Sequence, residues 1–152
     1  MKLLATLVLL FALLGATSSA APTIGIGGPW SRPAIDTGVV YLTLANHGAA
    51  ADRLVAASSP VARAVELHES SETMGSMNMG SMSGMAMGDV SSMKRVAYVT
   101  IPPHGAVAFA PGGYHIMLVG LRRTLRQNES FPLRLHFARA GWEATTVHVR
   151  PI

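Results

Sequence analysis

The sequence predicts an all-β sandwich built as a single domain, and three observations support this fold class. Short runs of β-branched and apolar residues recur along the chain and are separated by turns rich in Gly, Pro and Asn. No stretch shows a helical apolar period long enough to compete. About 132 residues remain after an N-terminal export sequence, which is enough for one domain with a core and too few for two.

Each expected strand ends at a turn or a chain-breaking residue. The expected strands cover residues 38–46, 53–58, 61–68, 95–101, 106–110, 114–120, 131–138 and 143–152. In 131–138 four apolar side chains alternate with polar ones, which predicts one buried face of the strand. These four are Phe131, Leu133, Leu135 and Phe137.

Residues 1–20 have the pattern of a cleaved secretory signal peptide. Lys2 precedes an apolar run, and the small residues Ser18 and Ala20 lie at positions −3 and −1 of a cleavage site before Ala21. The alternative is an uncleaved membrane anchor, but the apolar run is short for a membrane span. We therefore expect residues 21–152 to form an exported, periplasmic domain with no stable membrane insertion after cleavage.

Composition excludes several classes of function. The chain has no cysteine, so it has no disulfides, no lipid-modified cysteine and no thiolate for a blue-copper site. Its formal net charge of +4 comes from basic residues spread along the chain, which argues against nucleic-acid binding. No nucleophile elbow, paired carboxylates or phosphate loop is present, so we do not expect an enzyme. Asp52 and Arg53 are expected to form a local ion pair.

A methionine-rich stretch at about residues 70–92 interrupts the strand pattern. It consists largely of Ser, Gly and Met, which predicts a loop inserted between two strands. Six of its methionines are candidates for a secondary copper site, because thioether is the only sulfur ligand in this chain. They are Met74, Met77, Met79, Met82, Met85 and Met87. The alternative is a linker without a function.

The segment PGGYHIMLVG, residues 111–120, carries the main candidate ligands. His115 and Met117 lie two apart in an expected strand, so both side chains leave the same face. An imidazole beside a thioether is a soft, neutral ligand pair that suits Cu(I). His68 and Met93 lie at ends of other expected strands and could complete a tetrahedral site where strand ends converge. The alternatives are core packing for His115 and Met117, and a solvated surface position for His68.

These residues and their spacing resemble the PCuAC (DUF461) family of periplasmic copper chaperones. Twenty-one residues, 94–114, separate Met93 from the His115-x-Met117 pair, and the likeness extends from PWSRP near residue 30 to the terminal VHVRPI. The resemblance implies a cupredoxin-like Greek-key sandwich that binds Cu(I). It also implies delivery of copper to the apo copper domain of cytochrome c oxidase, alongside a Sco-type thioredoxin-like copper protein.

The chain departs from the family pattern at one place. Twenty-four residues separate His68 from Met93, where the family has about ten, and the Met-rich stretch makes up the excess. Met79, Met85 or Met87 could therefore replace Met93 as a ligand, although Met93 keeps the spacing to His115. Two other functions remain open from the sequence: a periplasmic copper buffer or resistance protein without a transfer partner, and a structural sandwich with an incidental Met-rich loop.

Overall fold

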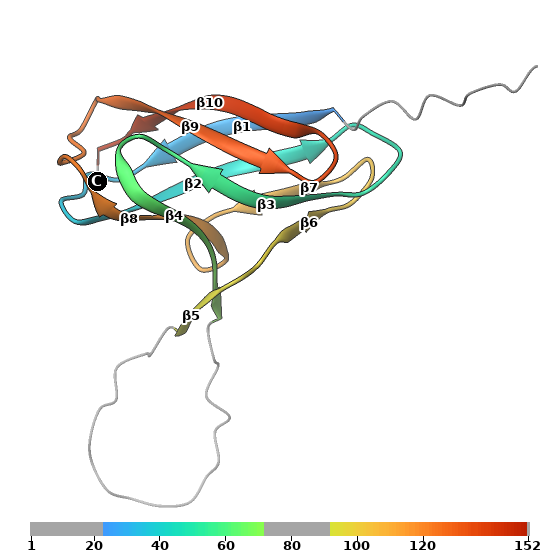
Figure 1. The fold of residues 1–152 in the computed structure, drawn as a ribbon, viewed down its shortest axis with the longest axis horizontal. Helices are drawn as coiled ribbons and strands as arrows, with labels where there is room; N and C mark the ends of the chain where they lie inside the picture. The colour runs from blue at the N-terminus through green and yellow to red at the C-terminus, as the bar shows by residue number, and fades with distance from the viewer. Residues whose placement is uncertain (1–22, 72–91, 152) are drawn as a thin grey trace, which may run out of the picture.

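The computed structural model describes residues 23–71 and 92–151, and in this part of the chain all regular structure is β. The strands run in chain order as follows (Figure 1): β1 Ile24–Ser31, β2 Thr37–Asn46, β3 Asp52–Ser58, β4 Ala62–Ser71, β5 Ser92–Arg95, β6 Val99–Ile101, β7 Ala106–Phe109, β8 Tyr114–Leu121, β9 Ser130–Phe137 and β10 Gly141–Val149. The described residues contain no helix long and apolar enough to cross a bilayer.

The ten strands form one curled sheet, in the order β5-β4-β8-β7-β2-β1-β10-β9-β3-β6. The curl brings β3 and β4 into contact, so the two halves of the sheet face each other across a common core (Figure 1). The predicted all-β single-domain sandwich is therefore confirmed.

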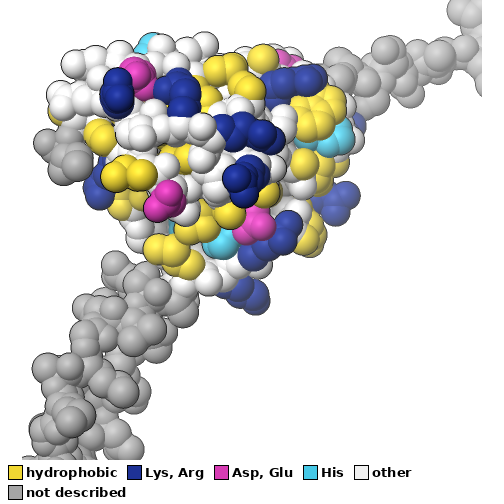
Figure 2. Space-filling model, turned by 60° about the vertical axis from the view of Figure 1, so that its left-hand side comes forward, with side chains coloured by type: hydrophobic (Ala, Val, Ile, Leu, Met, Phe, Trp, Pro, Cys, Tyr) yellow, Lys and Arg dark blue, Asp and Glu magenta, His cyan; other side chains and the backbone are white. Residues whose placement is uncertain are grey.

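Alternation along the strands produces the core. The four apolar side chains expected to face inward from 131–138 are all buried on β9, and β2 and β8 contribute Val40, Leu42, Leu44, Ile116 and Leu118. Burying each such side chain contributes about 1.5–3 kcal/mol to folding. Since successive side chains on a strand leave opposite faces, the same alternation places polar residues on the outer surface. On the face drawn in Figure 2, Lys and Arg outnumber Asp and Glu and are separated by other side chains.

The prediction of a single strand over residues 95–101 was wrong, because the two ends of this segment belong to two different strands. Residues 92–95 form β5, which pairs with β4, whereas residues 99–101 form β6, which pairs with β3. β4 and β3 lie near opposite ends of the strand order, so the chain crosses from one edge of the sheet to the other between β5 and β6. No single straight strand can pair with both.

β1 was not expected from the sequence, because glycine weakens a strand pattern. Its pairing with β2 shifts register between Gly27 and Trp30, and Gly28 has a φ of 53°, a backbone conformation that favours glycine. The strand forms because β2 pairs along one side and β10 pairs in parallel along the other.

The expected ion pair between Asp52 and Arg53 was also wrong. The Asp52 side chain is buried, and its carboxylate accepts hydrogen bonds from the backbone N–H groups of Arg53 at 2.8 Å, Arg139 at 2.9 Å and Ala140 at 2.9 Å. The Arg53 guanidinium lies 5.1 Å from the centroid of the Tyr98 ring. Neighbouring side chains on a strand point to opposite faces, so the two charges are directed apart.

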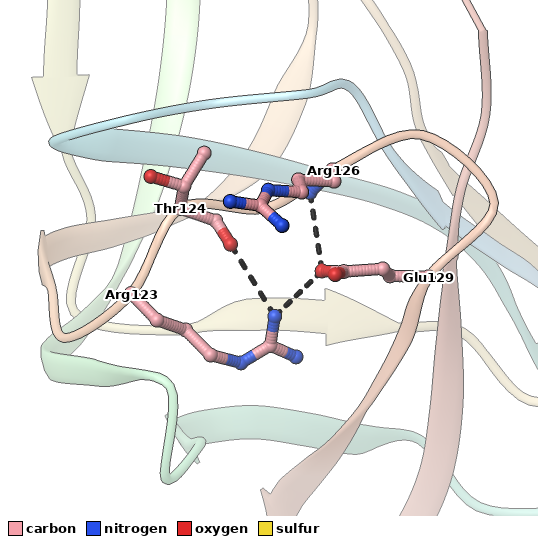
Figure 3. Close-up of polar contacts among 4 residues, drawn as sticks. All are labelled: Arg123, Thr124, Arg126 and Glu129. Atoms are coloured by element: carbon pink, nitrogen blue, oxygen red, sulfur yellow. Dashed lines mark hydrogen bonds and ion pairs between the residues drawn. The ribbon is translucent and has the colours of Figure 1, made fainter.

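A carboxylate also orders the loop between β8 and β9 (Figure 3). Glu129 Oε2 accepts hydrogen bonds from the backbone N–H of Arg126 at 3.2 Å and from the Arg123 guanidinium at 2.6 Å. The hydrogen bond from the Arg126 backbone, followed by that from Arg123, lowers the pKa of Glu129 below its usual 4.5.

Candidate metal centre

Strands β5, β4 and β8 lie side by side and bring the four predicted ligands onto one face. In the antiparallel register His68 of β4 lies opposite His115 of β8. Met117 follows His115 by two residues on β8, and Met93 of β5 lies opposite Ser70, two residues beyond His68. Directly opposed residues, and residues two apart on one strand, leave the same face of a sheet. His68, Met93, His115 and Met117 therefore share a face.

The two imidazoles are close together and shielded from water. Their ring centroids are 5.7 Å apart, with a tilt of 40° between the ring planes. His115 is 3% exposed, and the His68 side chain is 13% exposed. Histidine is seldom so shielded without a partner for its polar atoms.

Each imidazole uses one nitrogen in a hydrogen bond and leaves the other without a partner. His115 Nδ1 lies 3.1 Å from the carbonyl oxygen of Gly113, which only accepts, so Nδ1 carries the proton. His68 Nε2 lies 3.0 Å from Oε2 of Glu66, and donates to that carboxylate. The remaining nitrogens, Nδ1 of His68 and Nε2 of His115, are buried and have no hydrogen-bond partner among the described residues. In the neutral rings both present a lone pair.

The carboxylate that holds His68 is itself in an ion pair. Arg95 Nη1 lies 3.3 Å from Glu66 Oε1, while His68 binds the other carboxylate oxygen. The hydrogen bond from His68, aided by the charge of Arg95, lowers the pKa of Glu66 below its usual 4.5 against a smaller opposing effect of burial. Glu66 is thus held as an anion beside the site.

The two methionines occupy different positions around the histidine pair. Met117 is partly buried and lies opposite Glu66, one step along the sheet from the histidines. Met93 is 55% exposed and lies diagonally across from His68 on β5, an edge strand of the sheet. A diagonal neighbour about 7–8 Å away is within reach of a long side chain. Met117 is therefore more shielded from solvent than Met93.

This donor set suits a soft monovalent ion. Two neutral imidazole nitrogens and two thioether sulfurs carry no charge, and soft sulfur ligands favour Cu(I) over magnesium, calcium or manganese. Within residues 23–71 and 92–151 no three side chains among His, Asp and Glu gather in an arrangement that could hold a metal.

The six candidate methionines from Met74 to Met87 lie outside the described residues. The strands that flank them are described: Ser71 at the end of β4 lies opposite Ser92 at the start of β5. Figure 1 shows this end of β4 and β5 extending from the body of the sandwich. The methionine-rich segment therefore joins the two strands that supply His68 and Met93.

Sequence reasoning did not identify Glu66 and Arg95. The signal available was the pattern Glu66-x-His68 on a strand, since residues two apart share a face and can form a hydrogen bond there. The position of Arg95 depends on how β5 and β4 pair. This pairing could not be predicted from the sequence, because a long segment separates the two strands.

A protein-family model described as lipoprotein LpqE-like matches residues 12–149 of the chain. The chain belongs to this family. LpqE-like proteins are part of the PCuAC (DUF461) group that the His115-x-Met117 motif resembles, so that resemblance is confirmed. No curated protein sequence matches the chain.

Solved structures of PCuAC domains share the fold of this LpqE-like chain. The copper-bound PCuAC domain from PmoF2 has a TM-score of 0.66 and 23% identity, and the match covers 88% of this chain and 97% of that one. The apo PCuAC domain from PmoF1 has a TM-score of 0.66 and 18% identity, with 87% and 97% covered. The Cu(I) form of DR1885 from Deinococcus radiodurans has a TM-score of 0.58 and 25% identity, with 90% and 83% covered. The cupredoxin-like sandwich predicted here is thus confirmed.

Proposed function

We propose that this protein is an exported metallochaperone that binds Cu(I) through His68, Met93, His115 and Met117. The observation that carries the proposal is the pair of buried imidazole nitrogens, Nδ1 of His68 and Nε2 of His115, that have no hydrogen-bond partner in the part of the chain that the structure describes. Leaving such atoms unpaired costs free energy in a folded protein, and a bound cation removes that cost. The similarity to the copper-bound PmoF2 domain and to Cu(I)-DR1885 also supports Cu(I) binding by this protein.

A site of this kind binds and releases an ion without turning a substrate over. Its four donors are neutral, and Met93 lies on an exposed edge strand. An incoming ligand from a partner protein can replace the exposed thioether first, while the buried imidazoles still hold the ion. Stepwise ligand exchange would transfer Cu(I) without releasing it to solvent.

The recipient that the family resemblance favours is the apo copper domain of cytochrome c oxidase, alongside a Sco-type thioredoxin-like protein. The N-terminal export pattern and the family's description as lipoproteins favour the periplasm as the place of action. The alternative is a copper buffer or resistance protein in the same compartment. The methionine-rich segment favours it, because additional thioethers increase storage capacity.

Competitive Cu(I) titration tests the binding site. Replacing His115 or Met117 with Ala should lower Cu(I) affinity at least tenfold, or about 1.4 kcal/mol, because each change removes one ligand. His136→Ala is the matched control, since His136 stacks on Trp142 on the outer face of β9 with ring centroids 4.5 Å apart. If both site variants bind as tightly as the parent, the proposed site is wrong.

A Cu(I)-transfer measurement distinguishes a chaperone from a buffer. The Cu(I)-loaded protein should pass its ion to the apo copper domain of the oxidase faster than free Cu(I) released by dilution would allow. Transfer limited by spontaneous release would instead favour the buffer.

A further inference from the structure

Glu66 is held by partners on both of its carboxylate oxygens. Oε2 accepts the hydrogen bond of His68 at 3.0 Å, and Oε1 lies 3.3 Å from Arg95 Nη1. The Glu66 side chain is 25% exposed, so the bond to His68 is partly sheltered from water. The three residues come from adjacent strands, since Arg95 of β5 lies directly opposite His68 of β4.

The same carboxylate determines which nitrogen of His68 is free. A carboxylate anion can only accept, so the proton of the neutral ring is placed on Nε2. The lone pair then lies on Nδ1, which, like Nε2 of His115, is buried and has no hydrogen-bond partner within residues 23–71 and 92–151. In the other tautomer the proton would be on Nδ1, and Glu66 would lose its hydrogen bond.

We propose that Glu66 is a positioning residue for copper binding: it fixes His68 as the Nε2–H tautomer, oriented so that Nδ1 faces His115. The inference rests on the proposed function, because it assigns His68 as a ligand. It follows the general behaviour of histidine ligands, whose second nitrogen donates to a carboxylate or carbonyl that sets tautomer and orientation. Gly113 has the same role for His115 through its backbone carbonyl.

Arg95 adds a second effect on the site. Because its guanidinium and the His68 ring contact different oxygens, both carboxylate oxygens of Glu66 are occupied. A free carboxylate would be a hard ligand, which favours divalent ions over Cu(I). The ion pair thus keeps the donor set soft.

The test combines the tautomer of His68 with Cu(I) affinity. Long-range ¹H–¹⁵N correlation spectra of the apo protein at about pH 8.5, where free imidazole is neutral, report which ring nitrogen carries the proton. In the parent His68 should be the Nε2–H form alone. Glu66→Ala should give a mixture of tautomers and Cu(I) affinity about 10–100-fold lower, the usual effect of losing such a partner. Glu66→Gln should restore part of both, since its amide oxygen still accepts.

Glu69→Ala is the matched control. Glu69 is on the same strand but leaves the opposite face from His68, so its removal should change neither the tautomer nor the affinity. An Nδ1–H form of His68 in the unmodified protein would overturn the proposal, and this measurement needs no variant to fold. Parent-like affinity in Glu66→Ala would also overturn it. If His68→Ala itself leaves affinity unchanged, the proposed copper site fails instead, so the two failures are distinguishable.

Discussion

At the scale of single residues, hydrogen bonds within the protein decide which atoms remain free for a ligand. His68 and His115 each donate one N–H, to Glu66 and to the Gly113 carbonyl, and the other nitrogen of each ring has no partner among the residues that the structure describes. His136 shows the contrast, because its ring stacks on an exposed tryptophan on the outer surface. The chemical role of a histidine here follows from its second partner, which residue type alone does not reveal.

Asp52 is the residue for which we expect the largest effect on stability outside the core. Asp52→Ala leaves three backbone N–H groups, those of Arg53, Arg139 and Ala140, without their acceptor. Hydrogen bonds to a charged group contribute about 1.5–3 kcal/mol, so the free energy of unfolding should fall by about 2–4 kcal/mol in urea titrations. Asp36→Ala is the control at an exposed position and should change it by less than about 0.5 kcal/mol. Equal losses in the two variants would contradict this assignment.

At the scale of elements, periodicity predicts strands well where apolar and polar residues alternate, and fails where pairing partners decide. Alternation alone identifies β9 and its buried face. It does not reveal β1, whose glycines are stabilised by strands on both sides, nor the division of residues 95–101 between two edges of the sheet. Those features depend on which strands become neighbours in the sheet, and the neighbouring strands lie far apart in the sequence.

The segment between β4 and β5 should add copper capacity without supplying the tight site. Deleting residues 74–88 removes six thioethers but keeps His68, Met93 and β5, so total Cu(I) bound should fall while one tight equivalent remains. Ordering a chain segment opposes binding at about 1–2 kcal/mol per residue fixed, which makes copper on this segment weaker. Equilibrium dialysis at graded Cu(I) concentrations measures both classes of site.

A variant with the six methionines changed to Leu at constant length controls for the shortened chain. Loss of the tight equivalent in both variants would show that one of these six is a ligand in place of Met93. Unchanged capacity and uptake rate in both would show that the segment only links two strands.

At the scale of the whole molecule, the curled sheet brings together residues that are far apart in the chain. His68 and His115 become direct neighbours because β4 pairs with β8, and Met93 joins them because β5 pairs with β4. The ligand types and the shared face of His115 and Met117 could be predicted from the sequence. The pairing of the two histidines and the carboxylate behind His68 could not, because strand order is set by tertiary packing.

The most direct test of the account is X-ray absorption spectroscopy of the protein loaded with one equivalent of Cu(I). We predict a first shell of two imidazole nitrogens and two sulfurs, with one sulfur lost in Met117→Leu. A shell of sulfur alone would place the copper on the methionine-rich segment, and a shell without sulfur would remove Met93 and Met117 from the site. Either result would contradict a copper centre built from His68, Met93, His115 and Met117.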